Sequence, residues 1–293
     1  MSTSTLPQAF CRPINDNDIE AVVACLQRGF PDRPRRYWEQ GLERMARRPA
    51  IEDYPRYGQA LIAEGKVVGV LLQIFSRRVT ATGANVRCNL SSWCVDPEYR
   101  SHSLTLHMNS VKRPEVTYVN ISPAPHTRKT IEAFGFRPFS QGRMIAAPIL
   151  SAPQRKARVV AFAADGPEAA LLTQSERRLL AEHAAMGCRA LVCVKDGLAY
   201  PFVVQPHRIV RNLIPCWRLI YCREVGEFVR FANAIGRHLL FRGGPLCAVD
   251  AMERVPGLVG WFVPGRIPPK YFKGPVPPGL GDLAYTEVVV LGP

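Results

Sequence analysis

The sequence predicts an α/β protein built of two similar halves in tandem. The chain has 293 residues, and a typical domain has about 150. Segments with helical and strand-like patterns alternate in both halves, and the order of elements in the first half recurs in the second. A short polar link, 151–157, separates them. We therefore predict domains at 1–152 and 158–293.

The composition is that of a globular protein with a strong positive charge. Hydrophobic residues make up 47% and charged residues 21%, and the formal net charge is +14. This charge favours an anionic partner, which includes nucleic acid, an acidic membrane surface or a phosphate-bearing cofactor. Several arginines lie close together: Arg33, Arg35, Arg36, Arg44, Arg47 and Arg48. Guanidinium groups suit phosphate contacts, but a solvated basic face has the same pattern.

The cysteines and histidines indicate neither a disulfide framework nor a metal site. There are nine cysteines without a close CxxC pair, which is typical of reduced, buried thiols. The six histidines lack the spacing of a metal-binding helix with a carboxylate, so no metal is expected. No apolar run approaches the ~18 residues of a membrane span. No signal peptide is recognisable, and a cytoplasmic protein is expected.

The first half is predicted to start with a helix capped by Asp16 or Asn17 and ending near Arg28, with apolar residues at helical spacing. A second helix follows Pro34. The other predicted elements are a hairpin over 59–63 and 67–75, a strand over 86–95, a helix over 103–111, a strand over 116–121, a helix over 126–134 and a closing segment over 144–150.

The second half is predicted to repeat this order. Thr173 or Ser175 caps a helix, and a hairpin turns at Asp196 and Gly197. The other predicted elements are a strand over 215–222, a helix over 225–240, a strand over 246–250 and a last strand over 283–291. The stretch 255–281 is rich in proline and glycine, and we interpret it as a covering segment outside the core.

Four features of the first half lie in a recognisable order: Arg12-Pro13 before a capped helix, the hairpin Glu64-Gly65-Lys66-Val67-Val68-Gly69, the run Val95-Asp96-Pro97-Glu98-Tyr99-Arg100, and the run Ile131-Glu132-Ala133-Phe134-Gly135-Phe136-Arg137-Pro138. With these features, residues 10–150 resemble the GNAT acyltransferase superfamily. The second half resembles it in outline only. The resemblance implies two tandem GNAT-like domains, each a mixed, mostly antiparallel sheet flanked by helices.

The resemblance also implies acetyl-coenzyme A, or another acyl-coenzyme A, as co-substrate. In the family, a splayed strand binds the pantetheine arm, and the following loop and helix N-terminus bind the pyrophosphate. The implied cofactor-binding residues are Cys94, Val95, Arg100, Ser101, His102, Ser103, Leu104 and Thr105. Arg100 matches the family loop, but Ser103 and Thr105 replace its two small positions. We expect weaker binding, because glycine allows closer backbone approach.

The catalytic groups of the family have no clear counterpart. The family's proton-donating tyrosine is matched by Ile131, and the strand 87–95 offers no carboxylate as general base. Four polar residues follow the motif order and are weak candidates: Cys94, Asn120, Ser122 and His126. A structural role explains each of them better: Cys94 as buried core filler, Asn120 as a strand end, and Ser122 and His126 as turn or cap residues. Three functions stay open: an acyltransferase acting on an amine or hydroxyl, a non-catalytic ligand- or partner-binding protein, and a nucleic-acid-binding protein.

Overall fold

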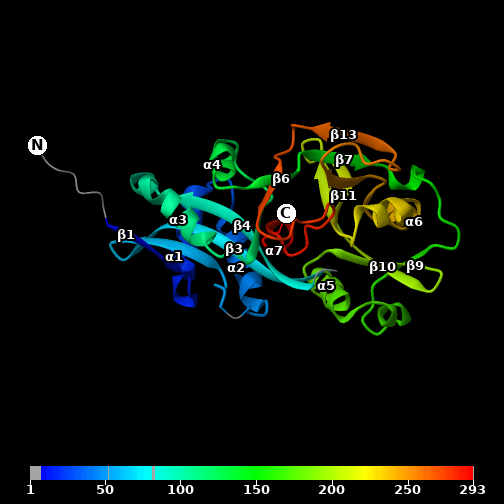
Figure 1. The fold of residues 1–293 in the computed structure, drawn as a ribbon, viewed down its shortest axis with the longest axis horizontal. Helices are drawn as coiled ribbons and strands as arrows, with labels where there is room; N and C mark the ends of the chain where they lie inside the picture. Colours follow the sequence, from blue (N-terminus) through cyan, green and yellow to red (C-terminus); the bar gives the residue numbers. More distant parts are fainter. Residues whose placement is uncertain (1–7, 52, 81–82, 293) are drawn as a thin grey trace, which may run out of the picture. The chain divides into compact units, whose positions relative to one another are not determined.

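The computed structural model describes residues 8–51, 53–80 and 83–292, and its strands form two seven-stranded sheets (Figure 1). The strand orders are β1-β2-β3-β4-β5-β14-β6 and β13-β7-β12-β11-β10-β9-β8. The pairs β4–β5 and β11–β12 are parallel, whereas the hairpin pairs such as β2–β3 and β9–β10 are antiparallel. The predicted fold class, mixed and mostly antiparallel sheets flanked by helices, is confirmed.

Most predicted elements are present with small shifts at their ends, and β6, β8, β13 and β14 are strands that the sequence analysis did not predict. The strands are β1 (Ala9–Pro13), β2 (Gly58–Ala63), β3 (Lys66–Thr80), β4 (Gly83–Val95), β5 (Val116–Asn120), β6 (Arg137–Ser140), β7 (Gly142–Ala146), β8 (Arg158–Ala161), β9 (Arg189–Lys195), β10 (Leu198–Ile209), β11 (Ile214–Tyr221), β12 (Cys247–Ala251), β13 (Gly260–Pro264) and β14 (Lys270–Lys273). The α-helices are α1 (Ile19–Gly29), α2 (Arg35–Arg47), α3 (Ser103–Ser110), α4 (Arg128–Ala133), α5 (Gln174–Ala185), α6 (Val225–Gly243) and α7 (Glu287–Val290). The 3-10 turns are η1 (Asp16–Asp18), η2 (Pro97–His102), η3 (Pro125–Thr127), η4 (Pro148–Leu150) and η5 (Pro167–Leu171).

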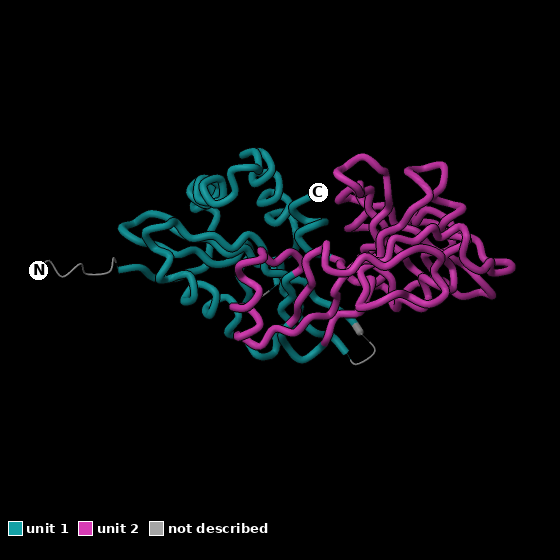
Figure 2. The backbone as a smooth tube through the Cα atoms, turned by 90° about the horizontal axis from the view of Figure 1, so that it is seen from above, with its two compact units in different colours: residues 1–120, 273–276, 285–292 teal, residues 121–272, 277–284, 293 magenta. Residues whose placement is uncertain are grey.

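The chain forms two compact units, and each of them consists of several stretches that are not contiguous in the sequence (Figure 2). The first unit contains 1–120, 273–276 and 285–292, and the second contains 121–272 and 277–284. This division differs from the predicted ranges 1–152 and 158–293. The reason lies in β7, which pairs with β12 and β13 and buries Met144 in the core of the second unit.

In the first unit, α1 and α3 cover opposite faces of the sheet. Two adjacent residues of β4 reach different helices. The Sγ atom of Cys94 lies 4.0 Å from that of Cys25 on α1, whereas the ring of Trp93 lies 4.8 Å from the ring of His107 on α3. Successive side chains of a strand point to opposite faces, so the two helices sandwich the sheet.

Local chemistry explains where several elements begin and turn. Thr173 and Glu176 form a capping box at α5, with the Thr173 amide donating to Glu176 Oε2 at 2.9 Å. At the start of the chain the cap is Asn15, not Asp16 or Asn17, because its side chain accepts the amide of Asn17. Both long hairpins turn through an acidic residue and glycine with positive φ, as expected for tight turns.

Two predictions for the C-terminal part are wrong. Residues 283–291 do not form a strand: they include α7, which packs on α2 in the first unit. A Cβ atom on Gly41 would lie 2.9 Å from Leu291 Cδ2, and Arg44 donates to the Leu291 carbonyl oxygen at 2.9 Å. The stretch 255–281 is not only a covering segment, because it contains β13 and β14.

The basic and thiol groups are mostly engaged within the fold. In the arginine cluster of α2, Arg35 pairs with Glu20 and Glu39, and Arg47 pairs with Glu43. All nine cysteines are free thiols, and seven of them are buried. A search of the described residues found no helix long and apolar enough to cross a membrane.

Candidate cofactor groove

The first unit has an unpaired strand edge where the family resemblance implies a cofactor. The parallel ladder between β4 and β5 runs only from the pair Val86–Val116 to the pair Asn89–Val119. Beyond Asn89, β4 continues to Val95 while β5 ends, and no described residue pairs with this edge of β4. The two strands diverge there. The Leu90 carbonyl oxygen accepts the side-chain amide of Asn89 at 3.0 Å, whereas the backbone groups of this edge beyond Leu90 have no partner among the described residues and can bond a ligand.

A β-bulge accompanies this divergence. Val70 of β3 pairs with Cys94, whereas Leu72 pairs with Ser91, so two residues of β4 face one residue of β3. Ser92 has a φ of 56°, which is uncommon for a residue other than glycine. Bulges of this kind bend a strand and often lie next to functional sites.

The predicted loop 100–105 forms regular structure, namely the end of η2 and the first turn of α3. The amide of Ser103 donates to the Arg100 carbonyl oxygen, so this amide is not available to a phosphate. The helix has no side-chain cap and no acidic residue in its first turn. Its N-terminal end therefore keeps a favourable field for an anion.

The side chains of this loop are accessible to a ligand. Arg100, Ser101 and Thr105 are exposed, and Leu104 is 49% exposed. His102 and Ser103 are half-buried. The predicted cofactor-binding residues thus lie along consecutive elements at the end of β4.

A bidentate ion pair fixes the entrance of this loop. Arg28 on α1 donates to the two carboxylate oxygens of Asp96 at 3.0 and 2.7 Å. The same guanidinium donates to the Val67 carbonyl oxygen at 3.2 Å. These contacts tie the loop after β4 to α1 and β3.

Cys94 is placed for packing. Its Sγ atom lies against Cys25, and a Cβ atom on Gly29 would come within 2.5 Å of Cys94 Cβ. The hydrogen bond with Cys25, together with burial, raises the pKa of the Cys94 thiol well above its usual range. The thiol faces α1 and is a poor nucleophile or base.

The other three catalytic candidates are dispersed. Asn120 ends β5 and is half-buried, whereas Ser122 and His126 are exposed and belong to the second compact unit. Ile131 lies in α4 with no exposed surface, and its side chain has no proton to donate. No general acid or base emerges from these positions.

A stacked pair that we did not predict lies next to the groove. The ring of Trp93 on β4 stacks on His107 of α3, which is only 1% exposed. Burial, with a smaller contribution from the charge of Lys273, lowers the pKa of His107 to about 4. The sequence offered one signal for this pair. Because successive strand residues face opposite sides of the sheet, Trp93 must face α3 if Cys94 faces α1.

The second unit has the same strand arrangement, but its edge is occupied. The ladder between β11 and β12 has two pairs, Trp217–Cys247 and Arg218–Ala248. Beyond it, the Leu283 amide donates to the Ile220 carbonyl oxygen at 2.7 Å. Residues 281–283 of the chain therefore take the place that is open in the first unit.

Comparisons with known proteins identify the fold. No known family model and no curated protein matches the sequence. Among solved structures, a GCN5-related N-acetyltransferase from Anabaena variabilis has a TM-score of 0.58 and 10% identity, covering 90% of this chain and 72% of that one. A GCN5-related N-acetyltransferase from Kribbella flavida has a TM-score of 0.55 and 12% identity, covering 92% and 72%. Eis1 from Mycobacterium abscessus has a TM-score of 0.51 and 13% identity, covering 90% and 72%.

These likenesses extend over most of the chain, and many further structures of this class match it. The chain therefore has the GNAT fold, in two tandem copies. At these identities the likeness concerns the fold alone, and activity is a separate question.

Proposed function

We propose that this protein is an acyltransferase that moves an acyl group from an acyl-coenzyme A to an amine or hydroxyl of an acceptor. Acetyl-coenzyme A is the expected donor. One observation carries the proposal: beyond Asn89, the edge of β4 has no strand partner among the described residues, and the chain then leads into the uncapped N-terminal end of α3. Nine free thiols favour a reducing compartment, and we propose the cytoplasm.

The residues present fit the two ends of such a cofactor to different degrees. The free backbone groups of β4 suit the amide groups of a pantetheine arm, which needs both donors and acceptors. Arg100 and the first turn of α3 suit the pyrophosphate, although the Ser103 amide is already engaged. We therefore expect the pantetheine end to contribute most of the affinity.

In the proposed reaction, a backbone N–H group of β4 polarises the thioester carbonyl. The acceptor nitrogen or oxygen forms a bond to the acyl carbon, the C–S bond breaks, and the thiolate leaves with the electron pair. The thiolate takes a proton from water, and the acceptor loses its own proton to solvent. This chain supplies no good base nearby, because Cys94 faces α1 and His107 has a pKa of about 4.

The second candidate function is binding of an acyl-coenzyme A or another ligand without turnover. One observation favours it: the positions that match the family's catalytic residues carry no effective proton donor or acceptor. Ile131 is buried and aprotic, and the Cys94 thiol has a raised pKa. A protein that kept the groove and lost proton transfer would have this arrangement.

Calorimetric titration with acetyl-coenzyme A and longer acyl thioesters, combined with an assay of thiol release, separates these functions. Binding followed by thiol release in the presence of an amine acceptor supports the acyltransferase. Binding without release over a broad set of amines and alcohols supports the second function. If no thioester binds at millimolar concentration, both are excluded.

Arg100→Ala tests the phosphate end of the groove. Loss of a charge-assisted contact should weaken coenzyme A binding by about 1–3 kcal/mol. Arg36→Ala is the matched control, since Arg36 is an exposed arginine on α2. Equal affinity of both variants and the unmodified protein would remove Arg100 from the site.

A further inference from the structure

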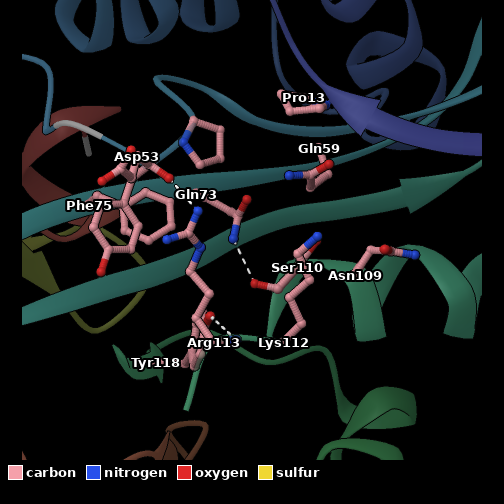
Figure 3. A pocket seen from close by; sticks show the side chains of 12 residues that line it. Pro13, Asp53, Gln59, Gln73, Phe75, Asn109, Ser110, Lys112, Arg113 and Tyr118 are labelled. Carbon is pink, nitrogen blue, oxygen red and sulfur yellow. Dashed lines mark hydrogen bonds between the residues drawn. The ribbon is translucent and has the colours of Figure 1, made fainter. Parts of the chain in front are cut away.

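The first unit contains a cavity of about 320 Å³ at the C-terminal end of α3 (Figure 3). It is bounded by the end of β1, the start of β2, the middle of β3, the middle of β5 and the segment 53–55. Asn109 and Ser110, the last residues of α3, line it, whereas the cofactor groove lies at Ser103. Eight helical residues separate the two places by roughly 12 Å.

The floor of this cavity contains a buried carbonyl oxygen without a partner. Gln73 is only 2% exposed, and its Nε2 donates to the Ser110 carbonyl oxygen at 2.7 Å. A carbonyl oxygen only accepts, so the amide nitrogen must face Ser110 and the orientation of the side chain is settled. Its Oε1 is buried and accepts no hydrogen bond from any described residue.

This oxygen is available to a ligand that donates a hydrogen bond. In Figure 3 the amide oxygen of Gln73 points away from Ser110, toward the side of the cavity where Gln59 lies. Buried polar atoms are almost always paired in folded proteins, so an N–H or O–H group that reaches this oxygen from the cavity would gain a hydrogen bond.

The cavity also carries an unpaired positive charge. Lys112 follows α3, lines the cavity and is exposed, and it forms no ion pair with the part of the chain that is described. The neighbouring Arg113 is already held, since its guanidinium stacks on Tyr54 at 4.6 Å and donates to the Asp53 carbonyl oxygen. Lys112 is therefore the cation left for an anionic ligand group.

The remaining lining is mixed. The rings of Tyr54 and Phe75 lie 4.7 Å apart, and Pro13 and Pro55 add apolar surface. Asp53, Gln59 and Asn109 are polar lining residues. The aromatic part accommodates a hydrocarbon or aromatic group. The volume lies in the range of about 300–1,000 Å³ that is typical of small-molecule sites.

We propose that this cavity binds a small carboxylic acid that carries an apolar group and an N–H or O–H donor, as an N-acylated amino acid does. The donor bonds Gln73 Oε1, the carboxylate faces Lys112, and the apolar group lies against Tyr54 and Phe75. The site is separate from the cofactor groove and does not depend on the acyltransferase function.

N-acetylphenylalanine is a suitable probe, and two analogues test its separate contacts. The N-methyl analogue lacks the N–H donor, and the carboxamide analogue lacks the negative charge. In calorimetry with the full chain, we expect the N-methyl analogue to bind about tenfold more weakly, the scale of one lost buried hydrogen bond. Equal binding of the probe and its N-methyl analogue, or no binding at millimolar concentration, would overturn the proposal.

A charge variant gives an independent test. Lys112→Met should lower the affinity for N-acetylphenylalanine about fivefold and leave the affinity for its carboxamide unchanged, as for one partly exposed ion pair. Lys66→Met, at an exposed lysine of the β2–β3 hairpin, should change neither affinity. If Lys112→Met affects both ligands equally, or neither, then the lysine does not face the carboxylate and the proposal fails.

Discussion

The edges of β4 and β11 beyond their parallel partners are equivalent in the two sheets, but among the described residues only that of β11 is hydrogen-bonded to another segment of the chain. In the first unit, the edge of β4 beyond Asn89 has no partner among the described residues. In the second unit, the edge of β11 beyond Arg218 is hydrogen-bonded to the chain itself, through Leu283 to Ile220 and through Cys222 to Gly281. The same splayed arrangement therefore leaves a free strand edge in one copy and is part of the packed structure in the other.

The helices that follow these two strands, α3 and α6, also differ in charge at their N-terminal ends. The first turn of α3 has no acidic residue, whereas α6 starts at Glu224 and carries Glu227 in its first turn. Glu227 has a raised pKa, caused mainly by burial. Carboxylates at a helix N-terminus stabilise the helix but repel a phosphate. The first turn of α3 is therefore free of carboxylates, whereas the start of α6 carries two, one of which lies in a site that disfavours its charged form.

The largest change in stability is expected from a substitution that displaces residues 281–283 from the edge of β11. Gly281 has a φ of 80°, and a Cβ atom there would lie 2.7 Å from Cys222 Sγ. Gly281→Val should lower the free energy of unfolding by about 3–5 kcal/mol, from steric overlap and backbone strain together. Urea unfolding measures this. Gly279→Val is the control, since Gly279 has open space around it. Equal stability of both variants would show that the edge is not tightly occupied.

The next effect is the pH dependence of stability that His107 causes, beside the free edge of β4. The folded-state pKa of His107 is about 4, below its ordinary value of about 6.5. Between these values the unfolded chain binds the proton and the folded chain does not, so stability is complete above pH 6.5 and falls as the pH drops toward 4. We expect the unmodified protein to lose about 2 kcal/mol relative to His107→Phe between pH 7 and 4.5. Parallel stability curves would contradict this assignment.

A smaller effect follows from giving α3 the charge of α6. Leu104→Glu puts a carboxylate in the first turn of α3 at a position that is 49% exposed. Coenzyme A should bind about fivefold more weakly, because the added charge opposes the pyrophosphate. Met108→Glu is the matched control at the other end of the helix, 57% exposed. Calorimetry that finds the same loss for both variants would point to a general charge effect.

The smallest effect is expected from the reverse change in the second unit. The double variant Glu224→Gln and Glu227→Gln removes the acids at the start of α6. No second coenzyme A site should appear, because 281–283 still occupy the edge of β11. The measurement is the calorimetric stoichiometry. A second bound coenzyme A per chain would mean that charge alone had closed the second site.

The local elements were predictable because their signals lie within a few neighbouring residues. Thr173 and Glu176 form the predicted helix start, and the turns at Gly65 and Gly197 need only their own backbone angles. The order of these elements, with the motif after Val95, was enough to predict the GNAT fold. The predicted cofactor residues lie together because they are contiguous in sequence.

The catalytic candidates stay predictions for a related reason. Whether a polar residue can act depends on which face it occupies and on its surroundings. Cys94 faces α1, and Trp93 beside it faces His107, although the sequence alone does not distinguish a bulged strand from a regular one. The bulge at Ser92 shifts the alternation that a pattern analysis would assume.

The sequence by itself determined most of the elements, their order and the fold class of this protein, since hydrophobic period, caps and turns are local properties. Only the tertiary structure decided which segment completes which unit. Residues 142–146 and 285–292 contain β-branched and apolar residues that suit several partners, and 281–283 is the short segment Gly-Asp-Leu. Their places depend on which strand edges and helix faces remain unsatisfied, as when Glu287 donates its amide to the buried Asn89 Oδ1 at 2.6 Å. Such pairing is set by the whole chain, because a free edge or face exists only once the other elements have packed.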